Sequence, residues 1–223
     1  MALIDQIAAL CPGGRLPDSY LLLDTETSSE VDEDCRIVQL GMIPVIDRKL
    51  QTVISEILDW PGMQITPKCL GVHHISMERV KAAGLSGPEY FKEVVPFIND
   101  YLSTKMVVGH NIVSYDLPVV EQAAALAGVT LVDNLNRVFD TGLLAKAHLM
   151  HAVPKLDETL EKFWLRLMPT RIGGWSLARC RDVFDLSKVV PEDAHDASVD
   201  CKLTHYTLEA FRSGAKFPLP GRH

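Results

Sequence analysis

Hydrophobic positions along the chain follow two patterns, one typical of buried strands and one typical of amphipathic helices. Apolar runs without helical period at residues 20–24 and 105–109 predict buried strands. Residues 36–46 and 51–58 predict two more strands that continue the first into an antiparallel meander, and residues 137–139 predict a short one. Because strands come first and then alternate with helices, we predict an α/β fold with a mixed central β-sheet flanked by helices.

Helix-like segments with polar caps separate and follow the predicted strands. They are residues 76–83, 89–102, 117–127, 141–151, 156–167, 176–184 and 196–212, after a short N-terminal amphipathic helix. Pro96 predicts a kink or a break in the second of these segments. We divide the chain into an N-terminal extension (residues 1–19), one domain (residues 20–212) and a C-terminal tail (residues 213–223) that we expect to be loose.

The composition is that of a globular protein, with 47% hydrophobic and 23% charged residues. The net charge of −7 argues against a protein that holds nucleic acid by bulk charge, but not against an enzyme that gathers carboxylates. The five cysteines are scattered without a CxxC pair, which favours reduced thiols in the cytoplasm over a zinc ribbon. Without a basic, apolar leader or a run of about 18 apolar residues, we expect a soluble, cytoplasmic protein with no membrane partner.

Two carboxylates stand together where the first predicted strand ends. Asp24 and Glu26 are two residues apart, so in an extended chain both project from the same face. Desolvation at the end of a buried strand disfavours their charge unless a cation lies between them, and Mg²⁺ and Mn²⁺ prefer oxygen ligands. The pair therefore indicates a divalent-metal site. A solvated strand-end acid followed by an acid in a turn is the alternative.

Three further polar residues adjoin the starts of predicted helices. Asp116 lies between a buried strand and a helix, where an aspartate is either a functional acid or a helix cap. His195 and Asp200 are five residues apart, roughly 140° of rotation on a helix, so they converge only if His195 stays in the preceding loop. A capping histidine and an exposed acid are the alternative.

In sequence order, these residues resemble the three motifs of the DEDDh exonuclease family within the ribonuclease H-like superfamily. Residues 23–27 (LDTET) resemble the first motif, residues 111–116 (NIVSYD) the second and residues 195–200 (HDASVD) the third. The resemblance extends over residues 20–212, which would make this segment a DEDDh exonuclease domain. The spacing within the second motif is similar to that of the three-prime repair exonucleases, more than to that of the DNA polymerase III epsilon subunit.

The resemblance implies a 3′→5′ exonuclease that hydrolyses phosphodiester bonds from the 3′ end of nucleic acid and releases nucleoside 5′-monophosphates. Asp24 would bridge two Mg²⁺ or Mn²⁺ ions, with Glu26 and Asp200 completing one metal site and Asp116 supporting the other. His195 would be the general base. Single-stranded DNA is the favoured substrate, as in DNA repair. The alternatives are an RNA-trimming exoribonuclease and, less favoured, a catalytically silent scaffold; a homodimer and a polymerase or repair complex are the assemblies left open.

The resemblance also implies a set of residues that bind the substrate. They are Thr25, Thr27, His73, Asn111 and Tyr115. For His73 two interpretations remain, because it either holds the terminal nucleotide or is an ordinary loop residue.

The chain departs from the family pattern after the first motif, where members carry a leucine that wedges against the terminal base. Val31 is the candidate replacement for this wedge, and Gln39 stands where glutamate is common, with no effect expected on the chemistry. Trp175 either stacks on a base or packs in the core, and the basic residues of segment 155–181 either contact phosphates or form a solvated face. We expect Asp140 to order the loop after the second motif.

Overall fold

The computed structural model describes residues 2–30, 34–191 and 195–218. Its centre is a seven-stranded sheet with strand order β5-β4-β2-β1-β6-β7, in which β3 pairs with β2. The strands are β1 (Tyr20–Thr27), β2 (Ile37–Ile46), β3 (Lys49–Leu50), β4 (Ile54–Asp59), β5 (Leu85–Ser86), β6 (Val107–Gly109) and β7 (Val138–Asp140). Strands β1, β2 and β4 form the predicted antiparallel meander, and β6 and β7 continue the sheet parallel to β1. The predicted mixed sheet is confirmed.

Strand β1 runs through the middle of the core. The side chains of residues 20–23 are at most 1% exposed, as expected for an apolar strand that is covered on both faces. In the antiparallel register with β2, Asp24 lies opposite Gly41 and Glu26 lies opposite Gln39. The first two candidate acids are therefore carried at the C-terminal end of a rigid, buried strand.

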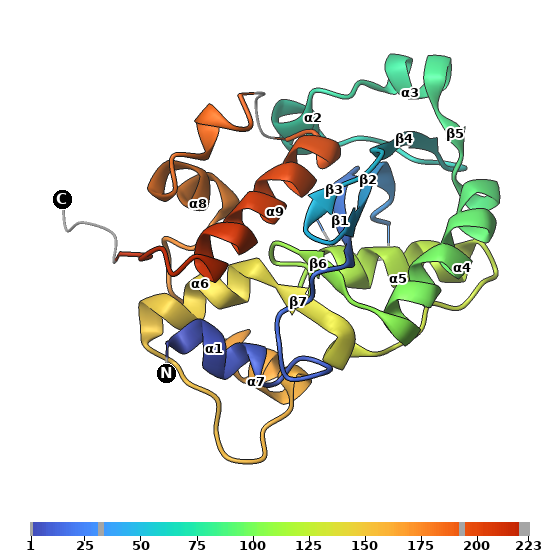
Figure 1. Ribbon diagram of the computed structural model, residues 1–223. Helices are drawn as coiled ribbons and strands as arrows, with labels where there is room; N and C mark the ends of the chain where they lie inside the picture. Colours follow the sequence, from blue (N-terminus) through green and yellow to red (C-terminus); the bar gives the residue numbers. More distant parts are fainter. Residues whose placement is uncertain (1, 31–33, 192–194, 219–223) are drawn as a thin grey trace.

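Helices cover both faces of the sheet. They are α1 (Leu3–Ala8), α2 (Pro67–His73), α3 (Met77–Ala83), α4 (Gly87–Thr104), α5 (Asp116–Leu126), α6 (Thr141–Met150), α7 (Leu160–Leu167), α8 (Leu177–Val183) and α9 (Ala197–Arg212), with 3₁₀ turns η1 (Leu135–Arg137) and η2 (Leu186–Lys188). Helix α9 crosses one face against β1 and β2, whereas α4 and α5 lie on the other side of these strands (Figure 1). The starts of α5 and α9 therefore approach the sheet from opposite faces.

Helix α4 runs through Pro96, so of the two predicted outcomes, a kink or a break, the break does not occur. Proline removes one backbone hydrogen bond and crowds the preceding turn. The surrounding side chains of Phe91, Val94, Val95 and Ile98 are buried against the core, and this burial keeps the helix continuous.

One helix and one helix boundary differ from the sequence-based prediction. Helix α2 was not predicted at all, although Thr66 caps its first turn and Pro67 occupies the position where the missing N–H of proline is harmless. Helix α7 begins at Leu160 rather than at residue 156, because Thr159 supplies its N-cap. Capping side chains thus set both boundaries more strongly than hydrophobic period does.

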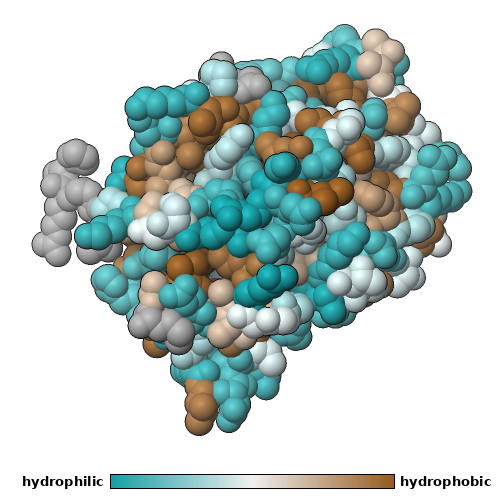
Figure 2. All heavy atoms as spheres, viewed as in Figure 1, coloured by the Kyte–Doolittle hydropathy of each residue, from teal (hydrophilic) through white to brown (hydrophobic). Residues whose placement is uncertain are grey.

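Both terminal segments pack on the domain. Ile4 and Ile7 of α1 are buried, and the ring of Phe217 lies 5.7 Å from that of Phe211 and is 7% exposed. The beginning of the predicted tail is therefore packed rather than loose, since an aromatic side chain gains more from burial than the segment loses in freedom. The face shown in Figure 2 is mostly hydrophilic, with hydrophobic residues scattered over it, as is normal for a globular protein.

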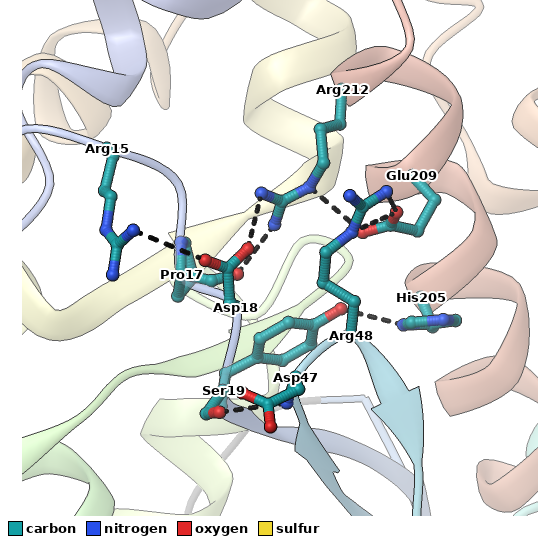
Figure 3. Close-up of polar contacts among 10 residues, drawn as sticks. Arg15, Pro17, Asp18, Ser19, Asp47, Arg48, His205, Glu209 and Arg212 are labelled. Carbon is teal, nitrogen blue, oxygen red and sulfur yellow. Dashed lines mark hydrogen bonds and ion pairs between the residues drawn. The ribbon is translucent and has the colours of Figure 1, made fainter.

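Polar contacts fasten the C-terminal end of α9 to the segment before β1 and to the β2–β3 turn (Figure 3). Arg212 donates from Nη2 to the Pro17 carbonyl oxygen at 2.6 Å and from Nη1 to Asp18 Oδ1 at 3.2 Å. Arg48 in the turn donates from Nε to Glu209 Oε2 at 2.9 Å. We call the set the α9 clamp; its five residues are Pro17, Asp18, Arg48, Glu209 and Arg212. They hold the end of α9 that lies away from the candidate site.

Candidate active site

The candidate site lies where β1 ends and where α5 and α9 begin. Asp24 and Glu26 lie on β1, Asp116 is the first residue of α5, and Asp200 is in the first turn of α9. A potential ligand atom from each of Glu26, His195 and Asp200 lies within 4.8 Å of the other two. The fold thus brings together groups that are separated by more than half of the chain.

Helix α9 places its two site residues as their spacing predicts. His195 precedes the helix and has a positive φ of 71°, and Asp196 is the N-cap, accepting from the Ser198 backbone N–H at 3.0 Å. The backbone N–H of His195 donates to Asp200 Oδ2 at 3.3 Å. The prediction that His195 lies in the loop and Asp200 one turn inside the helix is confirmed.

Asp24 and Asp116 join the cluster through their charges and through a shared neighbour. The Thr25 hydroxyl, next to Asp24 on β1, donates to Asp116 Oδ1 at 2.7 Å. Burial, followed by repulsion from Asp116, Asp200 and Glu26, raises the pKa of Asp24 well above its ordinary value. The charges of Asp116, Asp200 and Glu26 thus all act on Asp24, although Asp24 and Asp116 are not part of the tight group around His195.

Burial raises the pKa of the other three acids as well. Burial, followed by the charges of Asp200 and Asp116, raises the pKa of Glu26 to about 8. Burial raises the pKa of Asp116 to about 7 despite its hydrogen bond from Thr25, and burial raises the pKa of Asp200 too. At neutral pH the cluster therefore requires protons or cations to neutralise it.

The donor atoms fit a divalent cation. Asp200 Oδ1 is buried and, among the described residues, has no hydrogen-bond partner. A buried anionic oxygen without a partner is costly, and several carboxylates with one imidazole are a set that Mg²⁺ or Mn²⁺ accepts. The geometry leaves two roles open to His195, because its ring is near enough to Glu26 and Asp200 to be a ligand as well as a base.

All five of the predicted substrate-binding residues make hydrogen bonds within the protein. The Thr27 hydroxyl donates to the Ser29 carbonyl at 2.9 Å and accepts from the Tyr115 hydroxyl at 2.6 Å. His73 is 6% exposed; its Nδ1 accepts from the Ile75 N–H, so its Nε2 carries the proton and donates to the Thr27 carbonyl at 3.2 Å. The contacts of Thr25 with Asp116 are described above. These side chains fix the end of β1. His73 is the last residue of α2 rather than a loop residue, and both of its ring nitrogens bond to backbone groups.

The fifth, Asn111, lies in a loop that one buried carboxylate organises. Asn111 has a φ of 63°, a left-handed conformation that asparagine tolerates. Asp140 is fully buried and accepts from the backbone N–H groups of Asn111 (2.9 Å), Val113 (3.1 Å) and Leu143 (2.9 Å). Asp140 thus orders the second motif itself and joins it to the start of α6, whereas the sequence predicted that it would order the loop after that motif.

Other sequence-based candidates fall outside this cluster. Trp175 is half-buried, donates from Nε1 to the Ile172 carbonyl at 2.6 Å and lies beside the ring of His110, which favours packing over base stacking. In the basic segment, Arg166 is paired with Glu158 at 2.7 Å. Val31, the candidate wedge, lies outside the described residues.

Gln39 is a residue to which the sequence analysis gave no role. It is 4% exposed, and its side chain contacts the first residues of α9. A polar residue within the otherwise apolar stretch of a buried strand is the signal that points to it, since a buried carboxamide needs hydrogen-bond partners.

The structure also bears on the cysteines and on membrane-spanning helices. All five cysteines are free, in agreement with the prediction of reduced thiols. Within residues 2–30, 34–191 and 195–218, no helix has both the length and the apolar character needed to cross a bilayer.

Comparison with known proteins identifies relatives by sequence family and by fold. The RNase_T family model, described as "Exonuclease", matches residues 21–170. No curated protein matches the chain. Among solved structures, E. coli exonuclease I in complex with a dT13 oligonucleotide superposes with a TM-score of 0.63 and 15% identity, over 88% of this chain and 42% of that one. The complex of the same enzyme with a dA16 oligonucleotide superposes with a TM-score of 0.65 and 16% identity, over 88% of this chain and 42% of that one.

The zinc-bound form of the same E. coli enzyme with single-stranded DNA gives a TM-score of 0.63 and 15% identity over 89% of this chain and 42% of that one. At this identity the likeness shows a shared fold. This chain spans about two fifths of the length of the E. coli enzyme.

The raised pKa values predict how pH and metal affect stability. Unfolded aspartate and glutamate have pKa values of about 3.9 and 4.3, so between about pH 4 and pH 8 the folded, metal-free protein binds more protons than the unfolded chain. The contribution of these acids to the free energy of unfolding is therefore fully present below this window and is lost as pH rises through it, by up to about 1.4 kcal/mol per pH unit for each proton.

Thermal unfolding from pH 5 to pH 8 checks this expectation. In EDTA the Tm should fall across the range, and Mg²⁺ should raise the Tm more at pH 8 than at pH 5, because it competes with fewer protons. In EDTA, the Tm of a Glu26→Gln variant should depend less on pH than that of the wild type. A Mg²⁺ effect independent of pH would contradict the assignment of these carboxylates to a metal site.

Proposed function

This chain belongs to the exonuclease family whose model matches residues 21–170, and on that premise we propose that it is a metal-dependent 3′→5′ exonuclease. It hydrolyses phosphodiester bonds from the 3′ end of nucleic acid and releases nucleoside 5′-monophosphates. The observation that carries this proposal is the meeting of Glu26, Asp200 and His195 at the end of β1, beside Asp24 and Asp116, with a buried Asp200 oxygen left without a hydrogen bond among the described residues. The exonuclease domain covers residues 20–212, between the extension (1–19) and the tail (213–223).

Four carboxylates, those of Asp24, Glu26, Asp116 and Asp200, would hold two Mg²⁺ or Mn²⁺ ions. When bound, such ions supply positive charge beside both the attacking and the leaving oxygens of a phosphodiester. Asp24 is central in this arrangement because the charges of the other three acids all act on it.

The protein's own residues orient the reacting groups. Thr25 fixes one oxygen of Asp116 by its hydroxyl, and the backbone N–H of His195 fixes one oxygen of Asp200. The exposed His195 ring accepts the proton of the attacking water, a role for which an imidazole is suited near neutral pH. Thr27, Tyr115 and Asn111 shape the surface on which the terminal nucleotide lies.

Single-stranded DNA is the proposed substrate. Its support is the fold shared with E. coli exonuclease I, whose structures hold dT13 and dA16 oligonucleotides. The net charge of −7 fits an enzyme that engages a chain end at a metal site rather than along an extended basic surface. A cytoplasmic location is proposed on the ground that five free cysteines suit a reducing compartment.

A 5′-labelled single-stranded oligonucleotide with Mg²⁺ tests the activity. We expect a ladder that shortens from the 3′ end, with nucleoside 5′-monophosphates as products. Asp24→Asn should slow this degradation by about 10²-fold or more, since the substitution removes the acid on which the charges of the other three all act. Asp157→Asn, an exposed acid in the α6–α7 loop, is the matched control and should cleave as wild type does. Full-length labelled oligonucleotide that stays undegraded after prolonged incubation with the wild type would refute the proposal.

Matched DNA and RNA oligonucleotides of one sequence test the substrate class. We expect the single-stranded DNA to be degraded with the higher kcat/KM. Faster degradation of the RNA would make the protein an exoribonuclease with the same chemistry. A duplex with a recessed 3′ end, run alongside, measures the preference for single strands.

His195→Ala separates the two roles that the geometry allows. For a general base, kcat should fall by about 10²–10⁴-fold, whereas the affinity for Mn²⁺, measured by calorimetry, should stay nearly unchanged because the four carboxylates remain. A parallel loss of Mn²⁺ affinity would instead identify the imidazole as a metal ligand. His151→Asn changes an exposed histidine with a positive φ of 51°, which asparagine also adopts, and serves as the control.

A further inference from the structure

The side chain of Gln39 bridges the sheet and the start of α9. Gln39 lies on β2 opposite Glu26 in the antiparallel register. Its Oε1 accepts from the backbone N–H of Ala197 at 3.2 Å, and its Nε2 donates to Asp196 Oδ2 and to the Ser55 hydroxyl, each at 3.0 Å. One carboxamide therefore contacts β4 as well as the first residues of the helix that carries Asp200.

The orientation of this carboxamide follows from its partners. The backbone N–H of Ala197 can only donate, so the amide oxygen of Gln39 must face it, and the NH₂ group must face Asp196. Both hydrogens of the NH₂ group are then used, one by Asp196 and one by Ser55. Because Gln39 is 4% exposed, water does not compete strongly for these bonds.

Asp196 passes this restraint to the helix. Its Oδ1 accepts from the backbone N–H of Ser198 at 3.0 Å and from the Ser198 hydroxyl at 2.6 Å, while Oδ2 accepts from Gln39. Two residues along β2, Gly41 allows a close approach, since a Cβ at this position would lie 2.5 Å from the Ala197 carbonyl carbon. The first turn of α9 thus packs closely against β2, and the Gln39–Asp196 pair fixes its position there.

We propose that Gln39 is a positioning residue of the exonuclease: its hydrogen bonds to Asp196 and Ala197 set where His195 and Asp200 stand relative to Glu26 on the neighbouring strand. This inference rests on the proposed function. Asp196 directly follows His195, so a displacement of the cap moves the imidazole as well. A misplacement of about 1 Å in such a group can lower a rate by about 10²-fold.

Exchanging the donor and the acceptor tests the proposal. In Gln39→Glu, a carboxylate faces the Asp196 carboxylate; in Asp196→Asn, an NH₂ group faces the Gln39 NH₂ group. Each single variant is therefore mismatched. In the double variant Gln39→Glu/Asp196→Asn, the introduced asparagine donates to the introduced glutamate, which still accepts from Ala197. The amide oxygen of that asparagine can still accept from Ser198, so the helix cap is kept.

We expect each single variant to lower kcat with Mg²⁺ by about 10- to 10²-fold, with KM changed by less than about threefold. The double variant should recover to within about fivefold of wild type, a strongly non-additive result. Gln51→Glu makes the same chemical change at an exposed position of the β3–β4 connection and should retain wild-type kcat. A double variant as slow as the slower single one, or a Gln39→Glu variant with wild-type kcat, overturns the proposal.

Amide hydrogen exchange of Ala197 distinguishes failure of this inference from failure of the proposed function. In Gln39→Met the acceptor of this N–H is lost at nearly constant side-chain length, so exchange at Ala197 should accelerate by about tenfold or more. Unchanged exchange overturns the positioning role. If the wild type cleaves no nucleic acid but exchange accelerates as expected, the contact between Gln39 and α9 stands and the exonuclease proposal is the part that fails.

Discussion

Repulsion among buried carboxylates is the constraint around which this molecule is organised. Asp24, Glu26, Asp116 and Asp200 lie where burial and neighbouring charges raise their pKa values. Such a cluster costs folding free energy at neutral pH unless cations or protons neutralise it. The acids stay together because each is carried by an element that the core places independently: a central strand and two helices that pack on opposite faces of the sheet.

Neutral hydrogen-bond donors supply much of the fine geometry of the cluster. The Thr25 hydroxyl holds Asp116, the His195 backbone N–H holds Asp200, and the Gln39 carboxamide holds Asp196. A lysine or an arginine in these places would neutralise the same oxygens and compete with a cation for them. Neutral donors fix the carboxylates while leaving their negative charge available, which suits the proposed metal site.

Local sequence patterns predicted most of the fold and the location of the acids. Apolar runs indicated the strands, and the two-residue spacing of Asp24 and Glu26 placed both on one strand end. The His195–Asp200 spacing required a loop before a helix, which the structure contains. These inferences succeeded because each depends on the backbone geometry of a single segment.

What the sequence left undetermined depends on contacts between distant segments. The two partners of Gln39 at the start of α9 lie 157 and 158 residues further along the chain, and those of His73 include the end of β1. The continuity of α4 through Pro96 also depends on contacts with distant segments, because burial against the core maintains it. Hydrogen-bond partners across such separations follow from tertiary packing, which no local period encodes.

Helix α9 is held near both of its ends. It has 16 residues, and about 18 Å separates Asp200 from Arg212 along its axis at 1.5 Å per residue. Near one end, Ala197 packs closely against Gly41, and the α9 clamp holds the other end. Because the Arg48 side chain is 52% exposed, dissolved salt weakens that grip. At high ionic strength Arg212, whose side chain is 17% exposed, therefore does more than Arg48 to hold this end of α9.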